Sequence, residues 1–159
     1  DHRDLHSFPT RRSSDLADIR VRTEKKYKVL YNDLSDYGMG DNHEIFFLCA
    51  CLGFKAGKTK PLGSNGDDRF WSKTIESYEY ATYYAMMVKE NDHNFSSILE
   101  DRTVLNKVEE YANAGIEILI SDFLADYLDQ GESAEPRIDK SVAKELPKHL
   151  LYSVYSRKD

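Results

Sequence analysis

The sequence predicts a mainly α-helical fold: a compact bundle of about five helices with one short strand near its N-terminus. Apolar residues recur every three or four positions over most of the chain, which is the spacing of the buried face of a helix. Clusters rich in Gly, Pro, Asn and Asp interrupt this pattern and divide the chain into helix-length segments. The stretch Ile19–Arg22 instead alternates apolar and basic residues, as a half-buried strand does.

Each predicted helix follows from a local apolar pattern and its end signals. A stripe of Tyr and Leu begins after Thr23 and stops at Gly38. Asp41 followed by Glu44 predicts a helix cap, and the apolar run after it predicts a buried helix that ends at Gly53. The predicted elements are a helix over 23–37, a helix over 41–53, a loop over 55–68, a long helix over 68–90, a turn of helix over 95–99, a helix from 101 that Gly115 ends or kinks, and a helix over 116–127.

The chain divides into three regions. Its first residues, DHRDLHSFPTRRSSDL, resemble the in-frame translation of a common sequencing adapter, so we exclude residues 1–16 from the predicted fold as non-native. Residues 17–130 have the length and apolar content of a single helical domain. Residues 131–159 begin with a linker and continue as a weakly structured or helical tail.

Composition narrows the classes of function. A net charge of −6 over 159 residues argues against sequence-blind coating of nucleic acid, but allows a local basic patch. The chain lacks an apolar run of the roughly 18 residues that a membrane span needs. Cys49 and Cys51 lie in an apolar run that suppresses thiolate formation, so we expect reduced core thiols in a cytoplasmic protein.

One motif suggests nucleotide binding. In FFLCACLGFKAGKT, residues 46–59, a Gly-Lys-Thr triplet follows an apolar run, as in the phosphate-binding loop G-x-x-x-x-G-K-[ST]. Leu52 stands where that motif requires its first glycine, and Pro61 follows where a helix should begin. The preferred interpretation is a buried helix that leaves the core through a basic turn, and a diverged P-loop nucleotide-binding protein is kept as a second alternative.

The remaining polar residues predict no catalytic group, no metal centre and no cofactor. Outside the adapter-like segment, His43, His93 and His149 are far apart and lack the spacing of a ligand motif. We expect His43, near a helix start, to lie at the surface. We expect the glutamates at positions 109, 110 and 117 to form a solvated helix face.

A basic N-terminal segment predicts contact with DNA. A short basic strand followed by two helices is similar to a ribbon-helix-helix module, in which paired strands from a dimer enter the major groove. Lysines after the buried helix would add contacts to phosphates. The alternative is an edge strand with solvated charges. The predicted nucleic-acid-binding residues are Arg20, Arg22, Lys25, Lys26, Lys28, Lys55, Lys58 and Lys60.

Two motifs, CLGFKAGKTKPL (residues 51–62) and VEEYANAGIEIL (residues 108–119), resemble the Dnd system-associated protein 4 family. These small proteins are found with bacterial DNA phosphorothioation and its restriction machinery. The resemblance covers about residues 19–128 and implies an accessory role in defence against foreign DNA, with no catalytic residues to carry over. It implies packing roles: Gly53 would let the chain leave the buried helix, and Tyr111 with Asn113 would lock a junction of two helices. The matched positions are Gly53, Phe54, Lys55, Pro61, Glu109, Glu110, Tyr111, Ala112, Asn113 and Gly115.

The leading hypothesis is therefore a non-catalytic, cytoplasmic accessory protein of a bacterial phage-defence or DNA-modification system. It would bind a protein partner, DNA or both, and the sequence leaves a homo-oligomer open. The alternative is an acidic phage- or plasmid-encoded inhibitor that occupies the nucleic-acid site of a defence nuclease.

Overall fold

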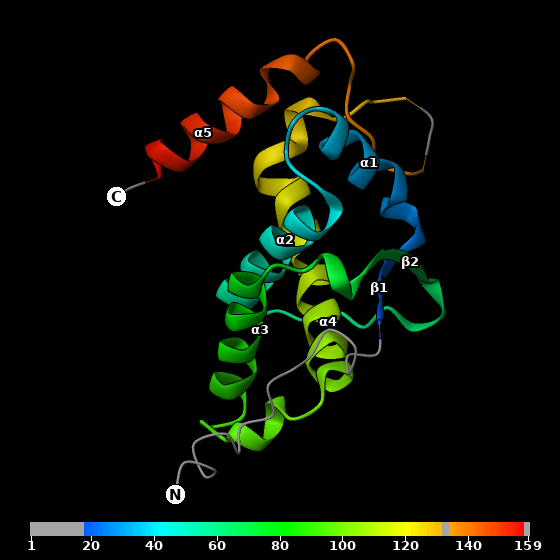
Figure 1. The fold of residues 1–159 in the computed structure, drawn as a ribbon. Coiled ribbons are helices and arrows are strands. Elements are labelled where there is room, and N and C mark those ends of the chain that lie inside the picture. Colours follow the sequence, from blue (N-terminus) through cyan, green and yellow to red (C-terminus); the bar gives the residue numbers. More distant parts are fainter. Residues whose placement is uncertain (1–17, 132–133, 158–159) are drawn as a thin grey trace, which may run out of the picture.

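A computed structural model describes residues 18–131 and 134–157 of the chain. The adapter-like segment, residues 1–16, lies outside these described residues. The predicted fold class is confirmed, because the described part is mainly helical and has a short antiparallel sheet near its N-terminus (Figure 1). Its α-helices are α1 (Lys28–Asp36), α2 (Asn42–Ala56), α3 (Ser77–Glu90), α4 (Asp101–Leu119) and α5 (Leu146–Ser156), and its strands are β1 (Arg20–Glu24) and β2 (Gly66–Trp71).

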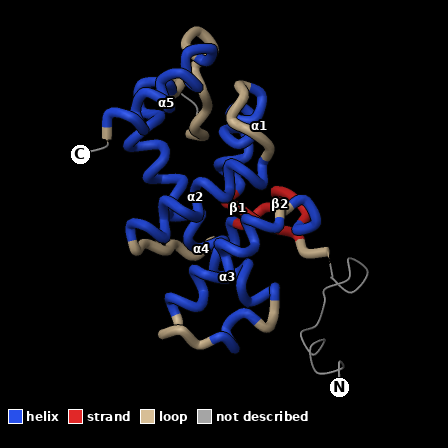
Figure 2. The backbone as a smooth tube through the Cα atoms, turned by 60° about the vertical axis from the view of Figure 1, so that its left-hand side comes forward, coloured by secondary structure: helices blue, strands red, loops and turns tan. Residues whose placement is uncertain are grey.

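The two central helices are α2 and α4, which make the most extensive contact in the fold. Figures 1 and 2 show α4 running through the middle of the molecule, with α2 crossing it. The predicted capping box starts α2: the Asp41 side chain accepts from the backbone of Glu44, and the Glu44 side chain accepts from the backbone of Asp41. From there Phe46 and Cys49 are fully buried against the inward face of α4.

The sheet corrects two predictions. Strand β1 pairs antiparallel with β2, from Arg20 opposite Trp71 to Glu24 opposite Gly66. The residues of β2 were predicted to be loop and the first turn of a long helix. That helix, α3, instead begins at Ser77, after a second capping box between Glu76 and Glu79. Because β1 finds its partner within the chain, the start of the fold is not the open strand of a ribbon-helix-helix module.

Two predicted helix ends are also wrong. Helix α2 continues past Gly53 to Ala56 and stops at Gly57, whose left-handed backbone (φ 66°) makes the C-terminal cap. Gly115 neither ends nor kinks α4, which runs to Leu119 and continues as a π-helical turn over Ile120–Leu124. The predicted separate helix over 116–127 is therefore the end of α4 with the turns that follow it.

The segment after residue 134 returns to the core. Ile138 pairs with Leu128 in an isolated bridge, and its backbone N–H donates to Asp33 of α1 at 3.0 Å. Ile138, Ala143 and Leu146 are buried in the same core as the central helices. Helix α5 then extends along one end of the molecule, and the α3–α4 connection lies at the opposite end (Figures 1 and 2).

Candidate functional site

Three of the predicted functional residues, Lys26, Lys60 and Asn113, lie together where the end of β1, the loop after α2 and α4 meet. The side-chain amide of Asn113, on α4, is buried at this junction. Its Nδ2 donates to Glu24 Oε1 at 2.9 Å, and the carbonyl oxygens of Lys60 and Pro61 lie 3.1 and 3.4 Å away. One side chain therefore joins three segments. We call Glu24, Lys26, Lys60, Asn113 and Glu117 the Asn113 cluster.

Charges in the Asn113 cluster are closely balanced. Lys26 Nζ lies 3.2 Å from Glu24 Oε2, and Lys60 Nζ lies 3.9 Å from Glu24 Oε1 and forms a close ion pair with Glu117. Burial by itself raises the pKa of Glu24, but the Asn113 hydrogen bond and the two ammonium groups outweigh it and lower that pKa. The hydrogen bond to Glu117 raises the pKa of Lys60. Glu24 is therefore held as a carboxylate that brings two basic segments together.

A hollow of about 710 Å³ opens beside this cluster, between the loop after α2 and the last turns of α4. Its wall presents the side chains of Lys58, Thr59 and Lys60 on one side and those of Glu117 and Ser121 on the other. Ammonium, hydroxyl and carboxylate groups around one opening suit a polar partner group of mixed charge.

The same loop does not have the geometry of a phosphate-binding loop. Gly57, Lys58 and Thr59 follow the C-terminal end of α2, whereas a P-loop follows a strand and opens a helix. The dipole at a helix C-terminus is negative and disfavours a phosphate group. The backbone N–H of Lys60 donates to the carbonyl oxygen of Glu110 at 3.0 Å, so it is already engaged within the fold.

The predicted DNA-binding residues fall into two sets. Arg20 stacks 3.5 Å above the Trp71 ring, and Arg22 has its backbone and guanidinium next to Glu109. Arg20 also pairs with Asp68, so these arginines, like Lys26 and Lys60, each have a carboxylate partner within the fold, although their side chains are only half-buried. The other set is exposed and makes no ion pair with a described residue: Lys25, Lys28, Lys55 and Lys58.

The two family-like motifs contact each other directly. A methyl group on Gly53 would lie 2.0 Å from the carbonyl oxygen of Tyr111, so the helices touch backbone to backbone. The Phe54 and Tyr111 rings meet edge to face with centroids 5.3 Å apart, and the Tyr111 hydroxyl donates to Glu90 of α3. Gly53 therefore serves close packing rather than the exit of a chain. Asn113 locks a loop onto one continuous helix, not a junction of two helices.

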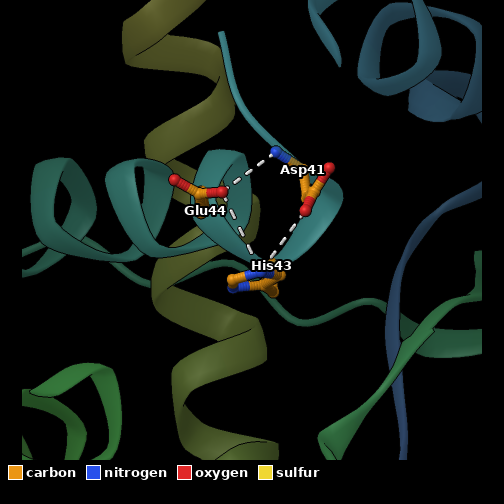
Figure 3. Close-up of side chains that lie close together, drawn as sticks. All are labelled: Asp41, His43 and Glu44. Carbon is orange, nitrogen blue, oxygen red and sulfur yellow. Dashed lines mark hydrogen bonds and ion pairs between the residues drawn. The ribbon is translucent and has the colours of Figure 1, made fainter. Parts of the chain in front are cut away.

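A second polar group lies at the start of α2. His43, predicted at the surface, is buried, and its Nδ1 lies 2.8 Å from Oε1 of Glu79, which is 0% exposed. Asp41 and Glu44 stand beside the ring, and Figure 3 shows the three side chains around one point. Their ligand atoms lie within 4.8 Å of one another. The capping box accounts for both carboxylates, and the positive end of the α2 dipole disfavours a cation there.

Three buried glutamates, Glu24, Glu79 and Glu109, were missed by the sequence prediction, and the two that lie on helices carry a detectable signal. Glu109, expected on a solvated face, is 2% exposed and accepts a 2.7 Å hydrogen bond from the backbone of Arg22. It lies four residues after Leu105 and three before Ala112, within the inward stripe of α4. Glu79 likewise lies on α3 four residues before Tyr83 and seven before Met86, both of which are buried. Position within the stripe predicts their burial better than residue type does.

Comparisons with known proteins add no relative: no protein-family model matches the chain, and no match was found among curated proteins or solved structures.

Proposed function

We propose that this chain is a non-catalytic accessory protein that binds an acidic partner protein through the surface around the Asn113 cluster. The proposal is carried by one observation: Glu24 and Asn113 hold the basic segment around Lys26 next to the basic loop around Lys60. Lys58 lines the adjoining hollow without an ion pair to a described residue. Its charge is therefore available to a partner. Cys49 is fully buried, Cys51 is half-buried and both are free thiols, which fits a reducing, cytoplasmic location as part of the proposal.

The resemblance to the Dnd system-associated protein 4 family supplies the biological setting of this proposal: phage defence linked to DNA modification. The two motifs that carry the resemblance lie together at the proposed site, through the Gly53–Tyr111 contact and the Asn113 hydrogen bonds. Their meeting supports a shared role for both motifs. DNA is a second candidate partner, because Lys25, Lys28, Lys55 and Lys58 are exposed.

A pair of double variants tests both candidates. Lys55→Glu/Lys58→Glu reverses charge at the proposed surface, and Lys140→Glu/Lys144→Glu makes the same change at two exposed residues before α5. Tagged wild type and variants are expressed in the native host, and co-purifying proteins are compared. We expect a partner protein that co-purifies with the wild type and with Lys140→Glu/Lys144→Glu but not with Lys55→Glu/Lys58→Glu. Equal recovery of the partner with both variants would refute this surface as the binding site.

A gel-shift assay with double-stranded DNA at low and high salt tests the second candidate. Direct contact with phosphates predicts binding that weakens with salt and with Lys55→Glu/Lys58→Glu. If the wild type shows no salt-sensitive binding to DNA, DNA is excluded as a partner and the acidic protein remains the candidate.

A further inference from the structure

One wall of the hollow beside the Asn113 cluster is a stripe along the end of α4. Ala114, Glu117 and Ile118 of α4, with Ser121 of the turn after it, line this wall at spacings of three and four residues. The loop over residues 57–60 forms the opposite wall. Among the described residues that line the hollow, Glu117 alone carries a negative charge. Its carboxylate therefore influences which charged groups the hollow can accept.

Glu117 reaches across the hollow to the loop. Its Oε1 forms a close ion pair with Lys60 Nζ, and the side chains of Lys60 and Glu117 are 40% and 47% exposed. An ion pair that is this open to solvent is weak, because water screens both charges and two long side chains lose freedom when they pair. A carboxylate from another molecule can therefore compete with Glu117 for the Lys60 ammonium group.

Other groups fix the position of Lys60 as well. Its Nζ lies 3.9 Å from Oε1 of the buried Glu24, and its carbonyl oxygen accepts from the Asn113 amide at 3.1 Å. Its backbone N–H donates to the carbonyl oxygen of Glu110 at 3.0 Å. The loop is thus held at Lys60 by contacts that do not involve Glu117. Exchange of the Glu117 carboxylate for another carboxylate does not require the loop to move.

The charges on the loop wall indicate what competes with Glu117. Lys58 lies on the same wall as Lys60 and makes no ion pair with a described residue. Lys58 attracts an acidic group to the hollow, but the position beside Lys60 is already taken by Glu117. Because like charges repel, an incoming carboxylate and Glu117 cannot share that position at low cost. The two carboxylates compete for one ammonium group.

We propose that Glu117 is an autoinhibitory residue: it occupies the position beside Lys60 that a carboxylate of the acidic partner takes in the complex. This inference rests on the proposed function, because it concerns the acidic partner's contact at the same surface. Binding exchanges one ion pair for another, and the Glu117 carboxylate is released to solvent. A row of DNA phosphates would place more negative charge beside the released Glu117 than a single carboxylate does, so this residue favours an acidic protein over DNA.

Glu117→Gln tests the proposal by the direction of its effect, because it removes the charge and keeps the shape of the side chain. The probe is a fluorescein-labelled polyglutamate peptide, and fluorescence anisotropy measures its binding in salt that screens distant charges. We expect binding to become about two- to fivefold tighter, the factor that corresponds to the loss of one competing exposed ion pair. If the Lys60–Glu117 pair only held the loop in place, the same change would weaken binding.

Glu110→Gln is the matched control, because it removes the same charge from α4 and the Glu110 side chain makes no ion pair with a described residue. It should leave the affinity for the peptide nearly unchanged, and circular dichroism verifies that both variants fold. Unchanged or weaker binding by Glu117→Gln, equal strengthening by Glu110→Gln, or no peptide binding by any of the proteins overturns the proposal. Binding of double-stranded DNA but not of the peptide by Glu117→Gln would assign the hollow to nucleic acid and overturn it as well.

The co-purification experiment separates this inference from the proposed function. If Lys55→Glu/Lys58→Glu loses the partner and Glu117→Gln recovers no more of it than the wild type does, the autoinhibitory role fails and the binding surface stands. If Lys55→Glu/Lys58→Glu retains the partner, the proposed function itself fails. Greater recovery of the partner with Glu117→Gln than with Glu110→Gln supports both.

Discussion

Gly53 and Gly115 lie at the crossing point of α2 and α4, where the two helix backbones touch. A methyl group on Gly115 would lie 1.6 Å from the carbonyl oxygen of Cys49 and 2.9 Å from the backbone nitrogen of Gly53. A methyl group on Gly53 would meet the Tyr111 carbonyl in the same way. Because the obstacle on each side is backbone of a buried helix, neither clash can be relieved by rotation of a side chain.

Gly115→Ala should therefore destabilise the protein by about 3 kcal/mol or more, as severe overpacking of a core does. Gly66→Ala is the control, because a methyl group there would lie 3.3 Å from the guanidinium of Arg22, whose flexible end can move. We expect the control to change stability by less than about 1 kcal/mol. Urea unfolding of both variants measures the difference, and similar midpoints would show that the helices can separate at little cost.

Asn113→Ala should destabilise the fold by about 2 kcal/mol, since it removes a donor from the buried Glu24 carboxylate and from two partly buried carbonyl groups. Asn113→Asp should cost more, because a second carboxylate would then face Glu24 at hydrogen-bond distance. Asn106→Ala changes an exposed Asn on the same helix and should have an effect within about 0.5 kcal/mol. Chemical denaturation measures the stability of the three variants. If Asn113→Ala loses no more stability than Asn106→Ala, the Asn113 amide does not link the three segments.

The elements with strong local signals were predictable from the sequence. The capping box at Asp41 and Glu44 and the stop at Gly38 depend on neighbours within a few residues, and both occur where expected. Strand β2 was not predictable in this way, because its first four residues, GDDR, lack an apolar strand pattern and acquire strand structure by pairing with β1. A partner far away in the sequence decides such a segment.

Two glycines near the candidate site also have roles that the local sequence does not distinguish. Gly57 caps a helix by its left-handed backbone, whereas Gly53 four residues earlier permits a helix–helix contact. Both roles favour glycine, and only the position of α4 distinguishes them. Likewise, the basic residues were recognised, but their ion pairs with Glu24, Glu109 and Glu117 depend on the three-dimensional fold. The sequence thus predicts which residues are basic, and the fold decides which of them remain available.

His43→Ala should destabilise the protein by about 3 kcal/mol, because it removes the side-chain partner of Glu79, a fully buried carboxylate whose other hydrogen bond is with the backbone N–H of Glu76. The expected loss of stability is larger than that from replacing an exposed histidine. His93→Asn serves as the control: His93 is exposed with φ 63°, a conformation that Asn tolerates. Thermal unfolding compares the two variants, and a His43→Ala protein as stable as His93→Asn would mean that water can replace the imidazole.

Glu109 and Glu24 should give opposite pH dependences. Burial raises the pKa of Glu109 above its ordinary 4.5, and the Arg22 backbone and guanidinium offset this only in part. The folded state therefore binds this proton more tightly than the unfolded state does. The contribution of Glu109 to stability is largest below the ordinary pKa and is lost as the pH rises through the raised value. For Glu24, whose folded pKa is lowered, the contribution is present above the ordinary pKa and is lost as the pH falls.

Glu109→Gln should consequently become more stable relative to wild type as the pH rises from about 4 to 7, and Glu24→Gln should become less stable over the same range. The comparison between the two variants cancels the pH dependence of the other groups, since each variant loses one carboxylate and keeps all the others. Melting temperatures at intervals across this range provide the measurement. Curves for the two variants that shift in the same direction relative to wild type would contradict the burial of Glu109 as the source of its raised pKa.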